Sequence, residues 1–569
     1  MHDASGVNTT AALSAETARQ AIGAAVAGVP IGDDPELVVL PLSDGYHLAY
    51  RGRAMVDIAP SVVFVDAMNG RELEHYSEFI NEVGTGTGTY GDTKKVSDTA
   101  IGGAFSADDK LRPTEITTYD MKGNLARTTV LFASAGSPSA SDIATSSTQT
   151  WTDATVVDAH TYAGMYYDYL FTRFNRHGVD DRDLRIALFT HPVSLGNISR
   201  ALPSVLQTYY INAEYCGSCG PNGRGAVEFG EGAPRDFYAP GVEVKPFSAA
   251  FDVVAHELTH AVTASSAGLN SFAYSEAAAL NEGFSDIFGV STAFFYEPPG
   301  DAPLHASYLE GRDLTVPAGA AGLARSMSDP QSTSDPDHYS QRIVGYDPQY
   351  NSTILSHAFY LAIEGGANRT SGLAVQGVGA VNREQIEKVF FRALTSLLPS
   401  NSTFALTRDA TIQSARDLYG DGSAVERAVT QAWDAVGVQD RTLPTATMLP
   451  NPAAMSLPAC SSSLTPPTWL VDITVSAGAS TFRVSSWTFD YYDHAGKLKE
   501  SDLLSPTTFA QLFNQCGPGD STVVAQSDVC AAMCLGLLGD KSGSAQMTVS
   551  ATDTTGRALT FTTGRVILR

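Results

Sequence analysis

The sequence predicts an α+β protein of several domains, and three observations lead to this prediction. The chain has 569 residues, more than one hydrophobic core usually holds. Alternating apolar runs mark its first part, whereas apolar residues recur at helical spacing from Val156 onward. A proline-rich stretch then precedes residues 468–569, which alternate again. We therefore expect β-rich and helical parts followed by a separate β-domain.

The composition argues against several classes of function. Hydrophobic residues make up 43% of the chain and charged residues 17%, as in folded globular domains. The formal net charge of −25 repels phosphate and anionic lipid, so we expect no nucleic-acid or membrane partner and favour peptide. No apolar run is long enough for a membrane helix. Met1–Gln20 lacks the pattern of a secretory signal, so localisation must be inferred from other features.

The first 83 residues predict a small α+β unit. A polar, alanine-rich segment is followed by strand-like runs at Glu36–Leu42, Tyr46–Arg51 and Val62–Asp66. The next residues, up to about 150, are rich in Gly, Thr and Ser. Short alternating runs such as Thr128–Ala133 there favour exposed antiparallel strands.

The spacing of apolar residues then becomes helical, and the second half of this region is predicted to be mostly helix. The segments with this spacing are 156–174, 249–265, 277–295, 352–364, 383–398, 405–419 and 423–436. Six prolines between residues 439 and 467 predict a linker. Beyond it, strand-like alternation predicts a β-sandwich over 468–569. The alternating segments are 469–475, 481–490, 547–551 and 559–563.

The six cysteines fall into two groups. Cys216 and Cys219 share a Gly-rich loop without a second Cys-x-x-Cys nearby, so a local disulfide or free thiols are favoured over a metal site. The other four lie near the C-terminus, and their even number permits disulfides.

The sharpest motif is HELTH at residues 256–260. In a helix, His256 and His260 lie one turn apart on one face, so both imidazoles can bind the same Zn²⁺ while Glu257 reaches a water on that metal. An apolar stripe beside the histidines favours a helix, at Val254, Leu258, Ala261 and Val262. The alternative is two helix histidines that bind no metal.

Catalytic zinc needs a third protein ligand, and the downstream stretch NEGFSD at 281–286 offers two. Glu282 and Asp286 share a helix face, so one carboxylate can bind the metal while the other accepts the N–H of a ligating imidazole. Taken alone, such an acidic pair is an ordinary solvated helix face. A third histidine six residues after the motif is excluded, because Ser266 stands there.

These motifs resemble those of the thermolysin-like zinc metallopeptidases, the neutral proteases. The resemblance covers about residues 84–438. Five stretches carry it: 252–263, 280–289, 325–330, 335–340 and 431–438. It implies a catalytic domain with a β-rich N-lobe over 84–248 and a helical C-lobe over 249–438, with a cleft between the lobes that the zinc helix spans.

The resemblance also implies residue roles at the metal. His256, His260 and Glu282 are expected to bind Zn²⁺, Glu257 to act as general base, and Asp286 to orient one histidine. Zinc lowers the pKa of a bound water to about 7 and polarises the peptide carbonyl. Peptide hydrolysis follows as the expected reaction.

Two further residues are implied to contact substrate. Asn212 resembles the residue that binds the substrate backbone, and Arg325 resembles the one that binds the substrate carbonyl near the S1′ pocket. Without the surrounding motifs, Asn212 would be read as a turn residue and Arg325 as a structural cation.

The sequence departs from the family pattern where the family stabilises the oxyanion. The family usually places a histidine before an Asn-Ser-Gly-Ile stretch, but residues 345–354 read GYDPQYNSTI, a shorter loop without it. Gln349 is the candidate substitute, although it is also an ordinary polar loop residue, and His357 is expected to be a packed helix residue. Tyr274 is the nearest candidate for the family's tyrosine. Loss of an oxyanion donor costs about 10² to 10³ in rate, so we expect weakened activity.

The resemblance bears on calcium and on maturation as well. Asp252 matches an acidic position of the family's double calcium site, but its partners fall on Ala293 and near Arg312, so we predict that the double Ca²⁺ site is absent. Residues 1–83, above all VVFVDAMNGR at 62–71, resemble the end of the family's propeptide. This implies a zymogen that is cleaved near residues 83–90.

The leading hypothesis is therefore a secreted zinc endopeptidase. It would be made as a zymogen, act as a monomer on protein or peptide substrates, and prefer an apolar P1′ residue; secretion is implied by the resemblance alone. The alternative, motivated by the missing histidine, is a catalytically impaired zinc-binding relative that serves as a binding protein.

Overall fold

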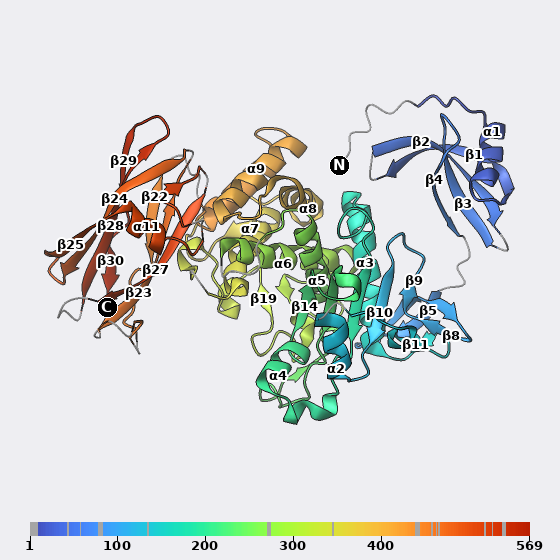
Figure 1. Cartoon of the computed structure of the whole chain (residues 1–569), viewed down its shortest axis with the longest axis horizontal. Coiled ribbons are helices and arrows are strands. Elements are labelled where there is room, and N and C mark those ends of the chain that lie inside the picture. The colour runs from blue at the N-terminus through green and yellow to red at the C-terminus, as the bar shows by residue number, and fades with distance from the viewer. Residues whose placement is uncertain are drawn as a thin grey trace. The chain divides into compact units, whose positions relative to one another are not determined.

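The computed structural model describes residues 9–569 except 43–44, 57–58, 78–82, 134–135, 270–274, 344–345, 439–443, 457–458, 462–463, 465–466, 479, 517–518, 526 and 537–541. The chain divides into two compact units, and Figure 1 colours it from the N-terminus to the C-terminus. Unit 1 comprises Met1–Ala261, Thr292–Ala306 and Gly311–Leu323. Unit 2 comprises Val262–Ser291, Ser307–Glu310 and Ala324–Arg569.

The N-terminal part of unit 1 is a helix packed on an antiparallel sheet of order β1-β2-β3-β4. Its elements are α1 (Ala15–Ala25), β1 (Val29–Leu42), β2 (Gly45–Val56), β3 (Ala59–Asp66) and β4 (Glu72–Ser77). Ser14 caps α1 by accepting the N–H of Thr17. Gly52 lets the helix approach β2, because a Cβ there would lie 2.5 Å from Cδ1 of Ile22. The three predicted strands all lie within this sheet.

Short strands follow, as the composition predicts. They are β5 (Val83–Thr87), β6 (Thr93–Ser97), β7 (Thr99–Ile101), β8 (Ala104–Ser106), β9 (Asp108–Asp109), β10 (Ile116–Asp120), β11 (Thr145–Ser146) and β12 (Thr150–Trp151). The predicted exposed strand at Thr128–Ala133 is wrong. Helix α2 (Leu125–Thr128) runs into a π-turn there. Asn124 caps α2, and Leu131 and Phe132 are buried, so capping and core packing outweigh a weak strand pattern.

A five-stranded sheet of order β14-β15-β13-β10-β9 forms the centre of unit 1. Its later strands are β13 (Ile186–Thr190), β14 (Ala213–Cys216) and β15 (Ala226–Phe229). Strands β10, β13 and β15 run parallel, whereas β14 is antiparallel and lies at the edge. Helix α3 (Ala154–Phe174) packs on this sheet, and α4 (Pro203–Tyr209) precedes β14. A Cys216–Cys219 disulfide closes the turn after β14.

All seven predicted helical segments lie on helices. Besides α3 these are α5 (Phe251–Ser265), α6 (Glu276–Tyr296), α7 (Pro348–Glu364), α8 (Arg383–Arg392), α9 (Phe404–Tyr419) and α10 (Ala424–Ala435). Two-residue strands join the intervening loops: β16 (Glu243–Val244) with β18 (Thr315–Val316), β17 (Leu309–Glu310) with β19 (Arg325–Ser326), and β20 (Gly366–Ala367) with β21 (Ala374–Val375). In the described segments, no helix is long and apolar enough to cross a membrane.

The C-terminal part of unit 2 has two antiparallel sheets that share one hydrophobic core. One has the order β22-β23-β27, with β22 (Thr445–Leu449), β23 (Thr468–Ser476) and β27 (Asp528–Gly536). The other contains β24 (Phe482–Asp493), β25 (Leu498–Leu504), β26 (Thr522–Val523), β28 (Gly543–Asp553), β29 (Ala558–Thr562) and β30 (Val566–Leu568). This region also contains helix α11 (Pro506–Leu512) and two disulfides, Cys460–Cys534 and Cys516–Cys530. Strand β22 lies inside the stretch predicted as a linker and pairs with β23.

Candidate active site

Helix α5 presents its two histidines side by side. The predicted apolar stripe is buried, at Val254, Leu258, Ala261 and Val262. The hydroxyl of Thr259 donates to the carbonyl of Ala255 at 2.7 Å and lies 2.7 Å from the hydroxyl of Tyr166 on α3, which fixes the helix on another side. The rings of His256 and His260 have centroids 4.8 Å apart and are nearly perpendicular.

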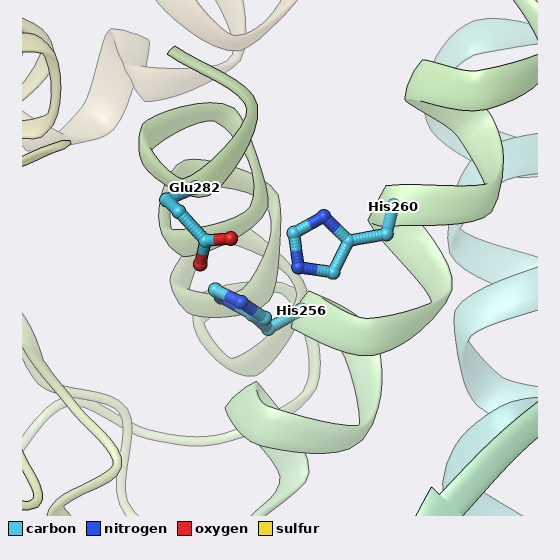
Figure 2. Close-up of side chains that lie close together, drawn as sticks. All are labelled: His256, His260 and Glu282. Atoms are coloured by element: carbon cyan, nitrogen blue, oxygen red, sulfur yellow. The ribbon is translucent and has the colours of Figure 1, made fainter. Parts of the chain in front are cut away.

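Helix α6 contributes a carboxylate to this pair. One ligand atom from each of His256, His260 and Glu282 lies within 4.8 Å of the others, and Figure 2 shows the three side chains turned toward one another. Gly283 follows where α6 meets α7. A Cβ at Gly283 would lie 2.9 Å from the carbonyl oxygen of Ser352, so the close approach of the helices requires a glycine.

This donor set fits Zn²⁺. Two imidazole nitrogens and one carboxylate oxygen are the protein ligands of many catalytic zinc sites, which keep a further position open. Ligand bonds of about 2.0–2.2 Å place the donors of one tetrahedral ion about 3.5 Å apart. The trio lies within a 4.8 Å limit, so small side-chain adjustments suffice to hold one ion. Glu257, the neighbour of His256, is buried with only 6% of its surface exposed.

Asp286 lies beside His256 and belongs to a cluster of charged side chains. Ligand atoms of His256, Asp286 and Glu310 also lie within 4.8 Å of one another. Arg325 donates to Asp286 at 2.6 Å and pairs with Glu310 at 2.9 Å. Burial lowers the pKa of the Arg325 guanidinium, but these two carboxylates raise it, and the net shift is upward. Arg325, predicted to bind substrate, is therefore held in place by two anions.

Two residues of this group were missed by the sequence analysis. Ser352 donates its hydroxyl to Asp286 at 3.2 Å. Ser352 directly follows Asn351 in the stretch 345–354, which was compared with the family pattern. Its position was therefore an available sequence signal. Glu310 pairs with Arg325 across the β17–β19 ladder, and nothing in its local sequence predicts that partner.

Asn212 lies directly before the edge strand β14. Its carbonyl accepts the N–H of Gly230 at 2.9 Å, which fixes the chain as it enters the strand. Within the described part of the chain, no strand pairs with the outer side of β14, and an edge of this kind can accept an extended peptide.

The three residues considered for the oxyanion region lie in different surroundings. Gln349 is exposed in the first turn of α7, where its backbone N–H donates to Asp347. Tyr274 falls outside the described residues. His357 is buried in α7, and its Nδ1 lies 2.7 Å from the carbonyl oxygen of Met327, which agrees with a packed helix residue.

Near Asp252 lie two further carboxylates and an arginine, Arg312. Burial and the nearby Asp313 raise the pKa of Asp252 to about 7. Burial raises the pKa of Glu297 to about 7 as well, and Asp313 adds to that shift. Nε of Arg312 pairs with Asp313 at 2.9 Å. Its Nη atoms donate to three backbone carbonyls, those of Gly300, Ala302 and His305.

Two histidines one helical turn apart, an adjacent glutamate and a carboxylate from the next helix define the class of zinc-dependent peptidases. Comparison with known families agrees with this class. Residues 83–264 match the thermolysin metallopeptidase catalytic domain, and residues 270–438 match the thermolysin metallopeptidase alpha-helical domain.

Two relatives that are similar in sequence give the same result. The chain is 32% identical to neutral protease B of Bacillus subtilis (strain 168) over 432 residues, which cover 74% of this chain and 72% of the relative. It is 34% identical to bacillolysin of Bacillus cereus over 362 residues, 63% of this chain and 55% of that one. The precursor of protealysin from Serratia proteamaculans aligns structurally with a TM-score of 0.40 at 25% identity, covering 57% of this chain and 87% of that one.

The chain therefore belongs to the thermolysin family of metallopeptidases. It is a zinc metalloendopeptidase, a hydrolase that acts on protein or peptide substrates.

Proposed function

We propose that this metalloendopeptidase binds its zinc through His256, His260 and Glu282 and uses Glu257 as the general base. The observation that carries the proposal is the set of three ligand atoms within 4.8 Å of one another. Zn²⁺ bound there supplies a Lewis acid that activates water and polarises the substrate carbonyl.

The chain's own residues supply the remaining chemistry. Glu257 accepts a proton from the attacking water and delivers it to the leaving amine, which requires a carboxylate close to both. Asp286 orients His256, and Arg325 holds Asp286 in turn with a hydrogen bond of 2.6 Å. Asn212 hydrogen-bonds the substrate backbone along the edge strand β14, and the S1′ pocket takes an apolar side chain.

The rate is reduced by the loss of an oxyanion donor. No histidine stands at the start of α7, and the exposed Gln349 is its weaker replacement. A lost donor costs about 10² to 10³ in rate, so turnover is slow but measurable. A zinc-binding protein without turnover is the second candidate, and the same missing histidine favours it.

The flanking regions fit a secreted zymogen. Residues 1–83 serve as a propeptide removed by cleavage near residues 83–90, and 84–438 form the peptidase. Residues 439–467, predicted as a linker, contribute β22 to the sheet of the β-sandwich accessory domain over 468–569. All six cysteines are in disulfides, which favours an oxidising compartment and hence secretion. The mature enzyme is a monomer.

We propose that the family's double calcium site is absent from this protein. The guanidinium of Arg312 already provides a positive charge beside Asp313 and occupies three backbone carbonyls. A divalent cation needs several free oxygen ligands, and the guanidinium competes with it for those beside Asp313.

The proposal is tested by peptide hydrolysis and zinc content measured together. Glu257→Gln should retain about one zinc per chain while kcat falls at least about 10²-fold. Glu384→Gln, a surface change on α8, is the matched control and should behave as wild type. Equal turnover by wild type and Glu257→Gln would refute the assigned base. A wild type that binds zinc without any turnover would favour the binding protein.

A further inference from the structure

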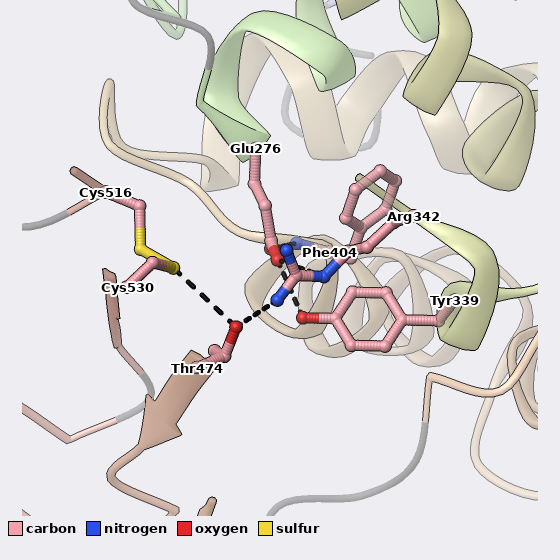
Figure 3. Close-up of a disulfide and its surroundings, with 7 residues drawn as sticks. All are labelled: Glu276, Tyr339, Arg342, Phe404, Thr474, Cys516 and Cys530. Atoms are coloured by element: carbon pink, nitrogen blue, oxygen red, sulfur yellow. Dashed lines mark hydrogen bonds and ion pairs between the residues drawn. A yellow bond between two sulfur atoms is a disulfide. The ribbon is translucent and has the colours of Figure 1, made fainter. Parts of the chain in front are cut away.

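Arg342 is a buried cation with partners in distant parts of unit 2. Only 6% of the residue is exposed. Its Nε lies 3.4 Å from Oε1 of Glu276, and its guanidinium lies over the ring of Tyr339, 4.7 Å from the centroid. Its Nη2 donates to the hydroxyl of Thr474 in β23, and Figure 3 shows the whole group. One side chain thus connects the helical region to the C-terminal sheets.

Glu276 joins the beginnings of two helices. It is the first residue of α6, and its Oε1 accepts the hydroxyl of Tyr339 at 2.7 Å. Its Oε2 accepts the N–H of Phe404, the first residue of α9, at 2.9 Å. A carboxylate in the first turn is also favoured by the helix dipole. Whatever holds Glu276 therefore holds the start of α6, the helix that carries Glu282 and Asp286.

Ile343, the residue after Arg342, connects this cluster of side chains to α7. The side chain of Asn351 donates to the carbonyl of Ile343 at 2.7 Å and accepts the N–H of Ile343 at 3.0 Å. The next residue of α7, Ser352, donates to Asp286 at 3.2 Å. The first turns of α7 thus link the neighbour of Arg342 to the carboxylate beside His256.

The C-terminal sheets form the other wall of this contact. Thr474 stands opposite Cys530 in the β23–β27 ladder, and its hydroxyl lies 3.8 Å from Sγ of Cys530, which is bonded to Cys516. The void lined by Glu276, Arg342, Phe404 and this disulfide measures about 10 Å³. That is at the lower limit for one water molecule, so little solvent reaches this group of side chains. Burial lowers the pKa of the Arg342 guanidinium, but Tyr339 and Glu276 raise it by more. The net shift is upward, so the side chain stays charged.

We propose that Arg342 is a positioning residue for the peptidase reaction and that the C-terminal sheets complete the active site through it. Thr474 holds Arg342 against Glu276, which fixes the beginnings of α6 and α7. The C-terminal region is then an integral part of the peptidase rather than a tethered binding module. This inference rests on the proposed zinc-binding role of Glu282.

Two variants of the full-length protein test it. Arg342→Met removes the charge at similar length, and Thr474→Val removes only the hydroxyl, so the second remains informative if the first folds poorly. At 25 °C, with native circular dichroism, each should lower kcat about 10-fold and weaken zinc binding about 10-fold. KM should change less than about twofold, because no substrate contact is removed. Arg342→Lys, which keeps a charge, should recover part of both losses.

Hydrogen exchange gives a readout that does not depend on turnover. Amides of residues 276–286 and 346–356 should exchange faster in Thr474→Val, whereas those of α10 should be unchanged. The matched controls are Arg369→Met, an arginine with a 64% exposed side chain, and Thr560→Val, an exposed threonine of β29. Both should match wild type in every measurement.

The inference is overturned if the variants only lower the melting temperature while kcat, zinc affinity and exchange of these amides stay within twofold of wild type. A wild type that neither binds zinc nor cleaves peptide would instead refute the proposed function. The exchange measurement would still decide whether Arg342 fixes the two helices, so the two failures are distinguishable.

Discussion

Two groups of carboxylates in this protein lie beside different partners. Around α5 and α6, Glu282 meets two imidazoles, which are neutral donors that suit a metal ion. Near Asp252, Nε of Arg312 pairs with Asp313 at 2.9 Å, while burial and Asp313 raise the pKa of Asp252 to about 7. The comparison underlies our proposal that acidic residues alone do not make a metal site. The two groups differ in the side chains that the fold brings to them, imidazoles in one and a guanidinium in the other.

The largest effect is expected from removing an imidazole of the first group. His260→Ala should lose zinc, because two remaining ligands hold the ion poorly, and hydrolysis should fall at least about 10³-fold. Zinc per chain and kcat are the measurements. His494→Ala, an exposed histidine, is the control and should keep both. Full zinc occupancy in His260→Ala would contradict the assignment of the metal ligands.

The second prediction concerns removal of the positive charge near Asp252. Arg312→Met should destabilise the protein by roughly 3–5 kcal/mol, because removing one partner leaves buried carboxylates uncompensated. Millimolar Ca²⁺ should restore part of the loss in the variant, while wild type should melt at the same temperature with Ca²⁺ or with chelator. A wild type that loses many degrees on calcium chelation would show that the double site exists after all.

A smaller effect is expected at Asp286. Asp286→Asn should weaken zinc binding and kcat/KM about 10- to 100-fold, because a neutral amide orients His256 less firmly and no longer pairs with Arg325. Competition with a chelator measures the affinity. Asp421→Asn, a surface change with a 91% exposed side chain, is the control. Unchanged zinc affinity in Asp286→Asn would mean that the carboxylate does not act on the histidine.

The smallest effect concerns His191, which lies 3.0 Å from both Glu231 and Asp153. Burial lowers the pKa of His191, but its hydrogen bonds to these carboxylates raise it more, to about 10. The folded pKa exceeds the unfolded value of about 6.5, so the stabilisation is complete below pH 6.5 and is lost as pH rises toward 10. His191→Asn should cost about 1–2 kcal/mol at pH 6 and much less at pH 9.5. Melting temperatures at both pH values test this, and a pH-independent difference would contradict it.

Residues within one helix were predictable because helical geometry fixes their relative directions. The spacing of His256 and His260, or of Glu282 and Asp286, places each pair on one face wherever the helix lies. The strand prediction at Thr128–Ala133 failed because a short run does not show whether its apolar residues are buried. Leu131 and Phe132 belong to the core of the central sheet, and the local sequence pattern does not predict their burial.

Contacts between distant segments were not predictable in the same way. Glu310 faces Arg325 only because two short strands pair, and Arg342 reaches Thr474 only because residues 132 positions apart come together. Many sequences of similar pattern could place an arginine at either position and expose it to water. Both contacts depend on the packing of distant segments, which brings the partners together.

The sequence by itself determined the helices, the donor types at the metal and the family, because these follow from local periodicity and side-chain chemistry. The tertiary structure alone decided which charges balance one another. Arg312 lies among backbone carbonyls, Arg325 between two carboxylates and Arg342 against the C-terminal sheets. The physical reason is that a buried charge must find a partner in space, and distance in space is set by packing rather than by position along the chain.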